Sequence, residues 1–167
     1  MKKSLRISAL VVALLMMSLC LFACKSDEGD KNTSKSFYVT YKGVKIELGK
    51  DADNIVDSLG DVLAVHELGD CGGLGAQIKY TYSSIAIYVL EDKDGNAVID
   101  GIEVYDDSVT TPQGVYIGMS AGEAKEKLDG AKQSGNALTV VDGKYYLKVK
   151  LDGGKVSEIH FGTDSGN

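Results

Sequence analysis

The sequence predicts an α+β fold of two tandem repeats, each a short helix packed on one face of an antiparallel sheet. Three observations lead to this prediction. Two helix-like segments of similar pattern recur at a constant spacing, and strands of alternating apolar and polar residues follow each of them. Turn signals rich in Gly and Asp separate the strands, and they hold many of the 20 glycines of the 167-residue chain.

Residues 1–23 have the layout of an export signal. Lys2, Lys3 and Arg6 form a positively charged start, and residues 7–23 contain no charged side chain. An uncharged run of 17 residues is at the short limit for crossing a membrane, so an uncleaved membrane anchor is the alternative interpretation.

The end of this run, Leu21-Phe22-Ala23-Cys24, resembles the lipobox of bacterial lipoproteins. The resemblance implies cleavage after Ala23 and a diacylglyceryl group on Cys24, which would hold the protein on the extracytoplasmic side of the cell membrane. Two acyl chains are enough for stable anchoring. Residues 24–36 contain no large apolar side chain and are expected to form a disordered tether.

Charge and cysteine content change once the signal is set aside. Residues 1–23 carry three basic residues and no acidic one, so the formal charge of −6 becomes −9 for the remaining 144 residues. Arg6 is the single Arg of the chain, and an acidic domain whose only cations are Lys is a poor nucleic-acid binder. If Cys20 leaves with the signal and Cys24 is lipidated, Cys71 is the one remaining thiol and no intrachain disulfide can form.

Residues 37–107 and 108–163 are predicted as the two repeats. A short amphipathic helix is expected after Asp51 in the first and after Ser120 in the second, since both residue types are good N-caps and Ser120 with Glu123 matches a capping box. At an offset of 69, the superposed pairs are Gly49 with Gly118, Asp51 with Ser120, Ala52 with Ala121, Ile55 with Ala124 and Leu59 with Leu128.

Five strands are expected in each repeat, two before the helix and three after it. In the first repeat they are residues 37–41, 44–48, 78–82, 85–90 and 98–105. In the second they are residues 109–111, 115–117, 137–141, 145–151 and 155–161. One copy of about 60 residues would be marginally stable alone, so the two sheets are expected to join.

The segment from Gly114 to Ser120, Gly-Val-Tyr-Ile-Gly-Met-Ser, resembles the helix entry of two groups of small envelope proteins. These are the assembly lipoproteins of the SmpA/OmlA type and the tandem-repeat β-lactamase inhibitor proteins. The chain is also similar in layout to uncharacterised bacterial repeat lipoproteins. The resemblance implies an envelope location and a protein-binding role, and it implies no enzymatic activity.

Strand alternation separates a core-facing side of the predicted sheet from an open side. The open side carries tyrosines mixed with charged residues, which suits a protein-binding surface because Tyr offers rigid amphipathic contact area. A plain solvated sheet face is the alternative. The candidate binding residues are Tyr88, Glu103, Tyr105, Tyr146, Lys148, Lys150 and His160.

Other motifs favour structural interpretations. Cys71 lies near His66 in sequence, but no third catalytic residue is evident, so a structural or reactive surface thiol is expected. Residues 92–96 are a hairpin turn, since their Gly comes too early for a calcium loop. Residues 72–75 are a loop between helix and strand, and Asp106 and Asp107, beside Asp100, are solvated loop charges. No catalytic residue, metal site or cofactor is predicted.

These observations predict a lipid-anchored extracytoplasmic binding lipoprotein that is not an enzyme and that contacts a protein through the open sheet face. The alternative is a structural or assembly factor of a cell-envelope complex. The sequence indicates no particular ligand, and it leaves the oligomeric state and the envelope type of the host open.

Overall fold

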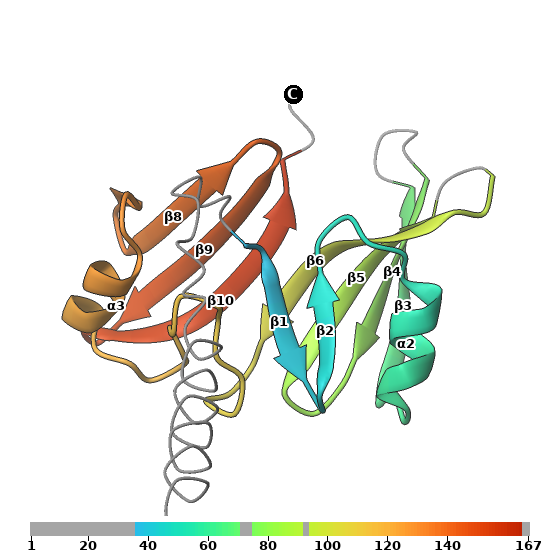
Figure 1. Ribbon diagram of the computed structural model, residues 1–167, viewed down its shortest axis with the longest axis horizontal. Coiled ribbons are helices and arrows are strands. Elements are labelled where there is room, and N and C mark those ends of the chain that lie inside the picture. Colours follow the sequence, from blue (N-terminus) through green and yellow to red (C-terminus); the bar gives the residue numbers. More distant parts are fainter. Residues whose placement is uncertain (1–35, 71–74, 92–93, 165–167) are drawn as a thin grey trace, which may run out of the picture. The chain divides into compact units, whose positions relative to one another are not determined.

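Most of the chain is β-strand in the computed structural model, which describes residues 36–70, 75–91 and 94–164 (Figure 1). Strands account for 52% of the structure and helices for 11%. All of the described residues belong to one compact unit, Ser34–Asn167.

A large antiparallel sheet of eight strands forms the frame of this unit. Its strand order is β3-β4-β5-β6-β10-β9-β8-β7, so β6 and β10 meet at the centre. The strands are β3 (Ala64–Asp70), β4 (Ala76–Thr81), β5 (Ile85–Glu91), β6 (Ala97–Val104), β7 (Lys132–Ser134), β8 (Ala137–Asp142), β9 (Tyr145–Asp152) and β10 (Lys155–Thr163).

A separate hairpin of β1 (Tyr38–Tyr41) and β2 (Val44–Glu47) lies against one face of the sheet (Figure 1). Lys42 and Gly43 form its tight turn, both with positive φ angles of 50° and 81°. Two residues in this region of backbone space give the twist that a short antiparallel hairpin needs.

Two short helices are found in the described part of the chain, α2 (Asp53–Leu59) and α3 (Ala121–Lys127). The predicted capping box of α3 is confirmed, because Ser120 accepts from the Glu123 amide and Glu123 accepts from the Ser120 amide. The predicted cap of α2 is wrong. Ala52 is its N-cap and offers no side-chain hydrogen bond, while Asp51 forms an isolated β-bridge with Val98.

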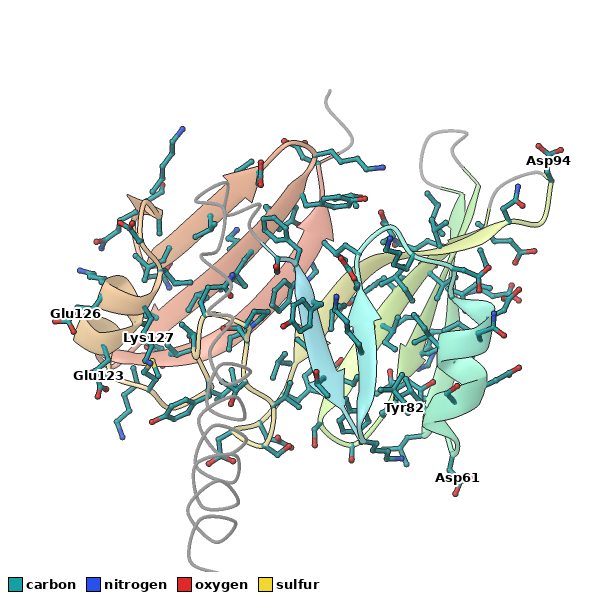
Figure 2. The ribbon with its side chains drawn as sticks, in the orientation of Figure 1. Asp61, Tyr82, Asp94, Glu123, Glu126 and Lys127 are labelled. Atoms are coloured by element: carbon teal, nitrogen blue, oxygen red, sulfur yellow. The ribbon has the colours of Figure 1, made fainter. Side chains whose placement is uncertain are left out.

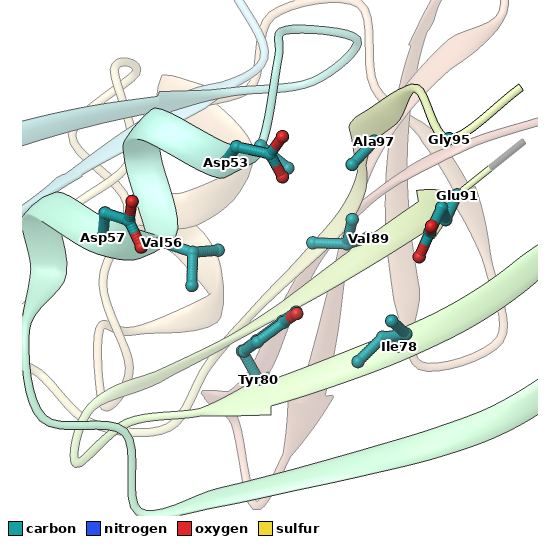
Figure 3. Close-up of a pocket in the computed structure, with 10 residues that line it drawn as sticks. Asp53, Val56, Asp57, Ile78, Tyr80, Val89, Glu91, Gly95 and Ala97 are labelled. Atoms are coloured by element: carbon teal, nitrogen blue, oxygen red, sulfur yellow. The ribbon is translucent and has the colours of Figure 1, made fainter.

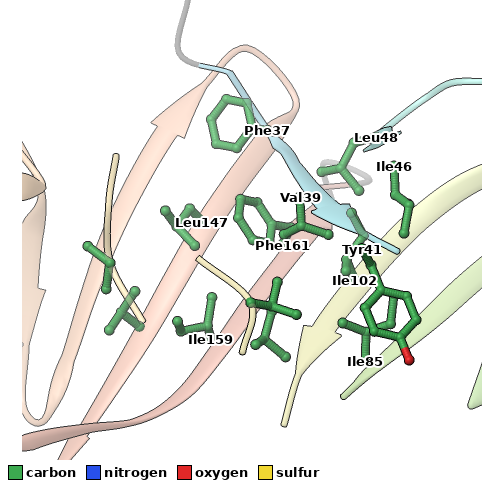
Figure 4. Close-up of a cluster of buried hydrophobic side chains, with 14 of the residues drawn as sticks. Phe37, Val39, Tyr41, Ile46, Leu48, Ile85, Ile102, Leu147, Ile159 and Phe161 are labelled. Carbon is green, nitrogen blue, oxygen red and sulfur yellow. The ribbon is translucent and has the colours of Figure 1, made fainter. Parts of the chain in front are cut away.

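The core lies between the sheet and the elements on its covered face. Phe37 and Val39, at the start of the hairpin, pack beside Leu147 and Phe161 of the sheet (Figure 4). Ile46 of β2, together with Val39, Leu147 and Phe161, is fully buried. The hairpin therefore covers the centre of the sheet, where β6 and β10 pair.

Charged side chains lie at the periphery, as Asp61, Asp94, Glu123 and Glu126 show, whereas Tyr82 points inward (Figure 2). The Tyr82 ring is 1% exposed and packs 6.2 Å from the Tyr41 ring. Burial raises the pKa of the Tyr82 hydroxyl, which has no hydrogen-bond partner among the described residues.

The predicted fold class, an α+β fold of two helix-plus-sheet repeats, is wrong. The protein is mainly β, with a single eight-stranded antiparallel sheet and only two helices among the described residues. The hairpin before α2 has no counterpart before α3. Residues 109–111 and 115–117 were expected as paired strands, but this segment forms a turn. In it the Thr111 amide donates to the Val115 carbonyl, and the Gly114 amide donates to the Thr111 carbonyl.

Two strands were not predicted, β3 and β7. Both lie at the edges of the sheet, where side chains on both faces remain exposed. An edge strand therefore lacks the apolar alternation that marks a half-buried strand. Within the described residues, no helix is long and apolar enough to cross a membrane.

Candidate binding face

The open face of the sheet lies opposite the hairpin and the helices. Ile87, Ile102, Leu147 and Ile159 are fully buried on the covered side. Their neighbours in each strand project to the other side, because successive residues of a strand alternate between faces. No described helix or strand covers this second face, which we call the open face (Figure 1).

A connected polar cluster on the open face is formed by Lys79 of β4, Tyr88 of β5, Glu103 of β6 and Tyr105, the residue after β6. Lys79 Nζ lies 2.8 Å from Glu103 Oε2, and the Tyr105 hydroxyl donates to the same oxygen at 3.0 Å. Lys79 Nζ also lies 4.9 Å from the ring centroid of Tyr88 and 5.8 Å from that of Tyr105. Ala86, the cross-strand partner of Glu103 on β5, is fully buried.

The surroundings of this cluster keep Lys79 protonated and Glu103 ionised at neutral pH. Partial burial opposes the charge on Lys79, but hydrogen bonds with Glu103, Tyr88 and Tyr105 outweigh it and raise the Lys79 pKa. Burial likewise opposes ionisation of Glu103, but hydrogen bonds from Lys79 and the two tyrosines lower its pKa. Burial raises the pKa of both Tyr88 and Tyr105, so both hydroxyls stay protonated at neutral pH.

His160 lies at the centre of the open face. Its cross-strand partners are Glu103 on β6 and Lys148 on β9, and its Nδ1 lies 4.0 Å from Glu103 Oε1. Its ring centroid is 6.1 Å from that of Tyr88 and 5.7 Å from that of Tyr146. Burial lowers the His160 pKa below 6.5, and the nearby carboxylates do not reverse this effect. The neutral imidazole is therefore favoured at pH 7, and it can donate one hydrogen bond and accept another.

Two glycines separate Tyr88 from Tyr146. Tyr88 pairs across the strands with Gly101, Gly101 with Gly162, and Gly162 with Tyr146. A Cβ atom on Gly162 would lie 2.5 Å from the Tyr146 hydroxyl oxygen, and one on Gly101 would lie 3.3 Å from Tyr88 Cδ2. The tyrosine side chains thus lean over bare backbone, and side chains at either glycine would push them away.

A shallow pocket of about 300 Å³ opens between these two tyrosines, with His160 among its lining residues. Asp100 also lines it and is held by two side chains. Gln77 Nε2 donates to Asp100 Oδ2 at 2.9 Å, and the Thr163 hydroxyl donates to Asp100 Oδ1. We call this the tyrosine pocket.

The structure brings five of the seven predicted binding residues together: Tyr88, Glu103, Tyr105, Tyr146 and His160. Lys150 is instead paired with Glu158 at 2.7 Å, and Lys148 is exposed to solvent. Cys24 and Cys71 lie outside the described residues. His66 is exposed on β3.

Sequence reasoning missed the residues at the other end of the tyrosine pocket, Gln77, Asp100 and Thr163, and both glycines. Asp100 was expected inside the strand of residues 98–105, and it lies in β6, half-buried at an irregularity in the β5–β6 register. Gly101 and Gly162 were the available signal, because a glycine inside a strand often marks close approach of another group.

A second and larger cavity, of about 450 Å³, lies on the covered side of the sheet beneath α2. Val56 of α2 points toward Tyr80 and Val89 of the sheet, and Asp53, Asp57 and Glu91 also line the cavity (Figure 3). This groove has an apolar floor with carboxylates around it.

Within the described residues, no three His, Cys, Asp or Glu side chains are placed to hold a metal ion. Comparisons with protein families, with curated proteins and with solved structures found no match to this chain.

Proposed function

We propose that this chain is a lipid-anchored extracytoplasmic binding protein, without enzymatic activity, that contacts a protein partner through the open face. The observation that carries the proposal is the ordered set of tyrosine, histidine and ion-paired side chains at the centre of that face. These groups are only half-buried, although they are already held by one another.

Prior ordering of a surface favours binding. Lys79, Glu103 and Tyr105 hold one another by hydrogen bonds, so little side-chain entropy remains to be lost when a partner covers them. Tyrosines give large rigid contact areas with a polar tip, and they are enriched at the centres of protein interfaces. The open face combines both properties.

The anchor is supported by the sequence of residues 1–24 alone. Replacing Cys24 by serine should remove the acyl chains and release the protein from membranes, since a diacylglyceryl group is the expected attachment. Mass spectrometry of the N-terminal peptide would check the acyl mass. Retention of the unlipidated variant in washed membranes would contradict the anchor.

Two exposed positions allow the open face to be tested without disturbing the core. Tyr105 is 44% exposed on the open face, and Leu63 is 70% exposed next to β3. Affinity capture from envelope extract would compare the full chain with its Tyr105→Glu and Leu63→Glu variants. Proteins that are lost with Tyr105→Glu and retained with Leu63→Glu would support binding through the open face.

The alternative function, an assembly factor of an envelope complex, is favoured by a different observation. The edge strand β3 and the residues before it expose several large apolar side chains, and an edge strand offers backbone groups for pairing with another chain. These side chains are Val62, Leu63, Val65 and Leu68. If a captured protein is lost with Leu63→Glu and retained with Tyr105→Glu, this function is favoured and the open face is refuted as the binding surface.

A further inference from the structure

We propose that the tyrosine pocket receives one arginine side chain of the partner protein, with the Asp100 carboxylate as its acceptor. This inference rests on the function proposed above and adds the chemistry that the open face recognises.

The geometry of Asp100 favours a forked donor. Each of its two oxygens already accepts one hydrogen bond, Oδ2 from Gln77 and Oδ1 from Thr163. A carboxylate has about four acceptor positions, so one position on each oxygen is left for an incoming group. A guanidinium presents two parallel N–H donors that match two carboxylate oxygens, whereas an ammonium is a point charge.

The aromatic lining of the pocket favours the same group. Tyr88, Tyr146 and the His160 imidazole surround a floor of glycine backbone. A planar guanidinium stacks on aromatic rings and is more weakly hydrated than an ammonium. The protein already places a cation on one of these rings, since Lys79 Nζ lies 4.9 Å from the Tyr88 centroid.

The charges around the pocket also favour a cation. Asp100 is the one acidic side chain among the described lining residues, which include no Lys, and burial favours the neutral form of His160. The charge of Lys79 is balanced by Glu103 at 2.8 Å. Lys148 is another nearby cation, and it lies across the strands from His160.

The size of the pocket suits one side chain. A volume of about 300 Å³ lies at the lower limit of ordinary ligand sites, so a single side chain fits better than a large cofactor. Arg6 is the one Arg of the chain and lies in the segment that cleavage after Ala23 would remove, so a second mature copy cannot supply the arginine. A separate protein is therefore the source.

The test uses short peptides that differ only in one side chain. The probes are blocked Gly-Xaa-Gly peptides with arginine, its neutral isostere citrulline, or lysine at the centre. They are titrated into the isotope-labelled full chain in detergent micelles and followed by amide NMR. The arginine peptide should shift the amide signals of Gly101 and Gly162, lysine should bind more weakly, and citrulline should cause no comparable shift.

Variants locate the site. Asp100→Asn keeps the shape of the acceptor but removes its charge, and it should weaken arginine binding about tenfold or more. Glu158→Gln is the matched control, because this carboxylate lies on the same sheet face but does not line the pocket, and it should leave the affinity unchanged. Equal binding of citrulline and arginine, no binding, or equal loss in both variants would overturn the assignment.

The outcomes separate this inference from the proposed function. A captured partner that is lost with Tyr105→Glu but kept with Asp100→Asn would leave the open face as the binding surface and refute the arginine pocket. Loss with neither variant would refute both proposals.

Discussion

The Lys79–Glu103 ion pair should contribute more to stability than the Lys150–Glu158 pair on the same face. The two pairs have nearly equal lengths, 2.8 and 2.7 Å, so their direct attraction does not distinguish them. They differ in burial. The side chains are 23% and 24% exposed in the first pair, and 42% and 44% exposed in the second.

Burial and the surrounding hydrogen bonds set the expected magnitudes. Exposed pairs contribute about 0.2–1 kcal/mol, and the more exposed Lys150–Glu158 pair should fall at about 0.3 kcal/mol. The Lys79–Glu103 pair is better shielded from water, and its carboxylate also accepts from Tyr105. We expect a coupling energy of about 1–2 kcal/mol for it, still below that of a fully buried pair.

A double-mutant cycle measures each coupling energy. The variants are Lys79→Met and Glu103→Gln, alone and combined, with Lys150→Met and Glu158→Gln as the matched cycle. Urea unfolding of the full chain gives the free energy of unfolding of each variant. Coupling energies that are equal within about 0.3 kcal/mol, or a larger value for the more exposed pair, would refute the view that the central cluster is held in advance of binding.

Three further predictions concern other parts of the molecule. Gly162→Ala should displace the Tyr146 ring, because the new Cβ would lie 2.5 Å from its hydroxyl oxygen; unchanged Tyr146 ring signals in NMR would contradict this. Ser120→Ala should lower the free energy of unfolding by about 1 kcal/mol through loss of the α3 cap, and an unchanged urea midpoint would argue against it. The His160 pKa is lowered in the folded state, so the unfolded chain binds the proton first and stability should fall as pH drops below 6.5. This decline should be absent in His160→Gln, and equal pH profiles would exclude His160 as its source.

The sequence was sufficient to place most strands of the central sheet. Apolar residues that alternate with polar ones indicate a sheet with one buried face, and β9 and β10 show this pattern, whereas β5 is a nearly continuous apolar run. The same alternation put Tyr88, Glu103 and His160 on one face, because side-chain direction in a strand follows position alone.

Strand pairing, in contrast, depends on contacts between residues far apart in sequence, which the apolar pattern of a single strand does not predict. The pairing of β6 with β10 brings Gly101 opposite Gly162, residues that are 61 positions apart in sequence. The tyrosine pocket exists only because of that register. Asp100 was not predicted as a site residue for the same reason, since its partners Gln77 and Thr163 come from distant strands.

The helices cover less of the core than the sequence predicted. Both were predicted from caps and apolar spacing, but the core centre is covered by the β1–β2 hairpin, with Phe37 and Val39 over the sheet (Figure 4). The strand β1 does alternate, with Val39 and Tyr41 buried, but a pattern of four residues does not show which layer the strand will join.

Site-specific photo-crosslinking in intact cell envelopes tests the proposed binding face most directly. A photo-reactive amino acid would replace Tyr105 or Lys148 on the open face, or Leu63 beside the edge strand β3, in the full-length chain. All three positions are exposed, so the substitutions should not disturb the core. The proposed function predicts the same protein adduct from Tyr105 and Lys148 and none from Leu63. An adduct from Leu63 alone would contradict it.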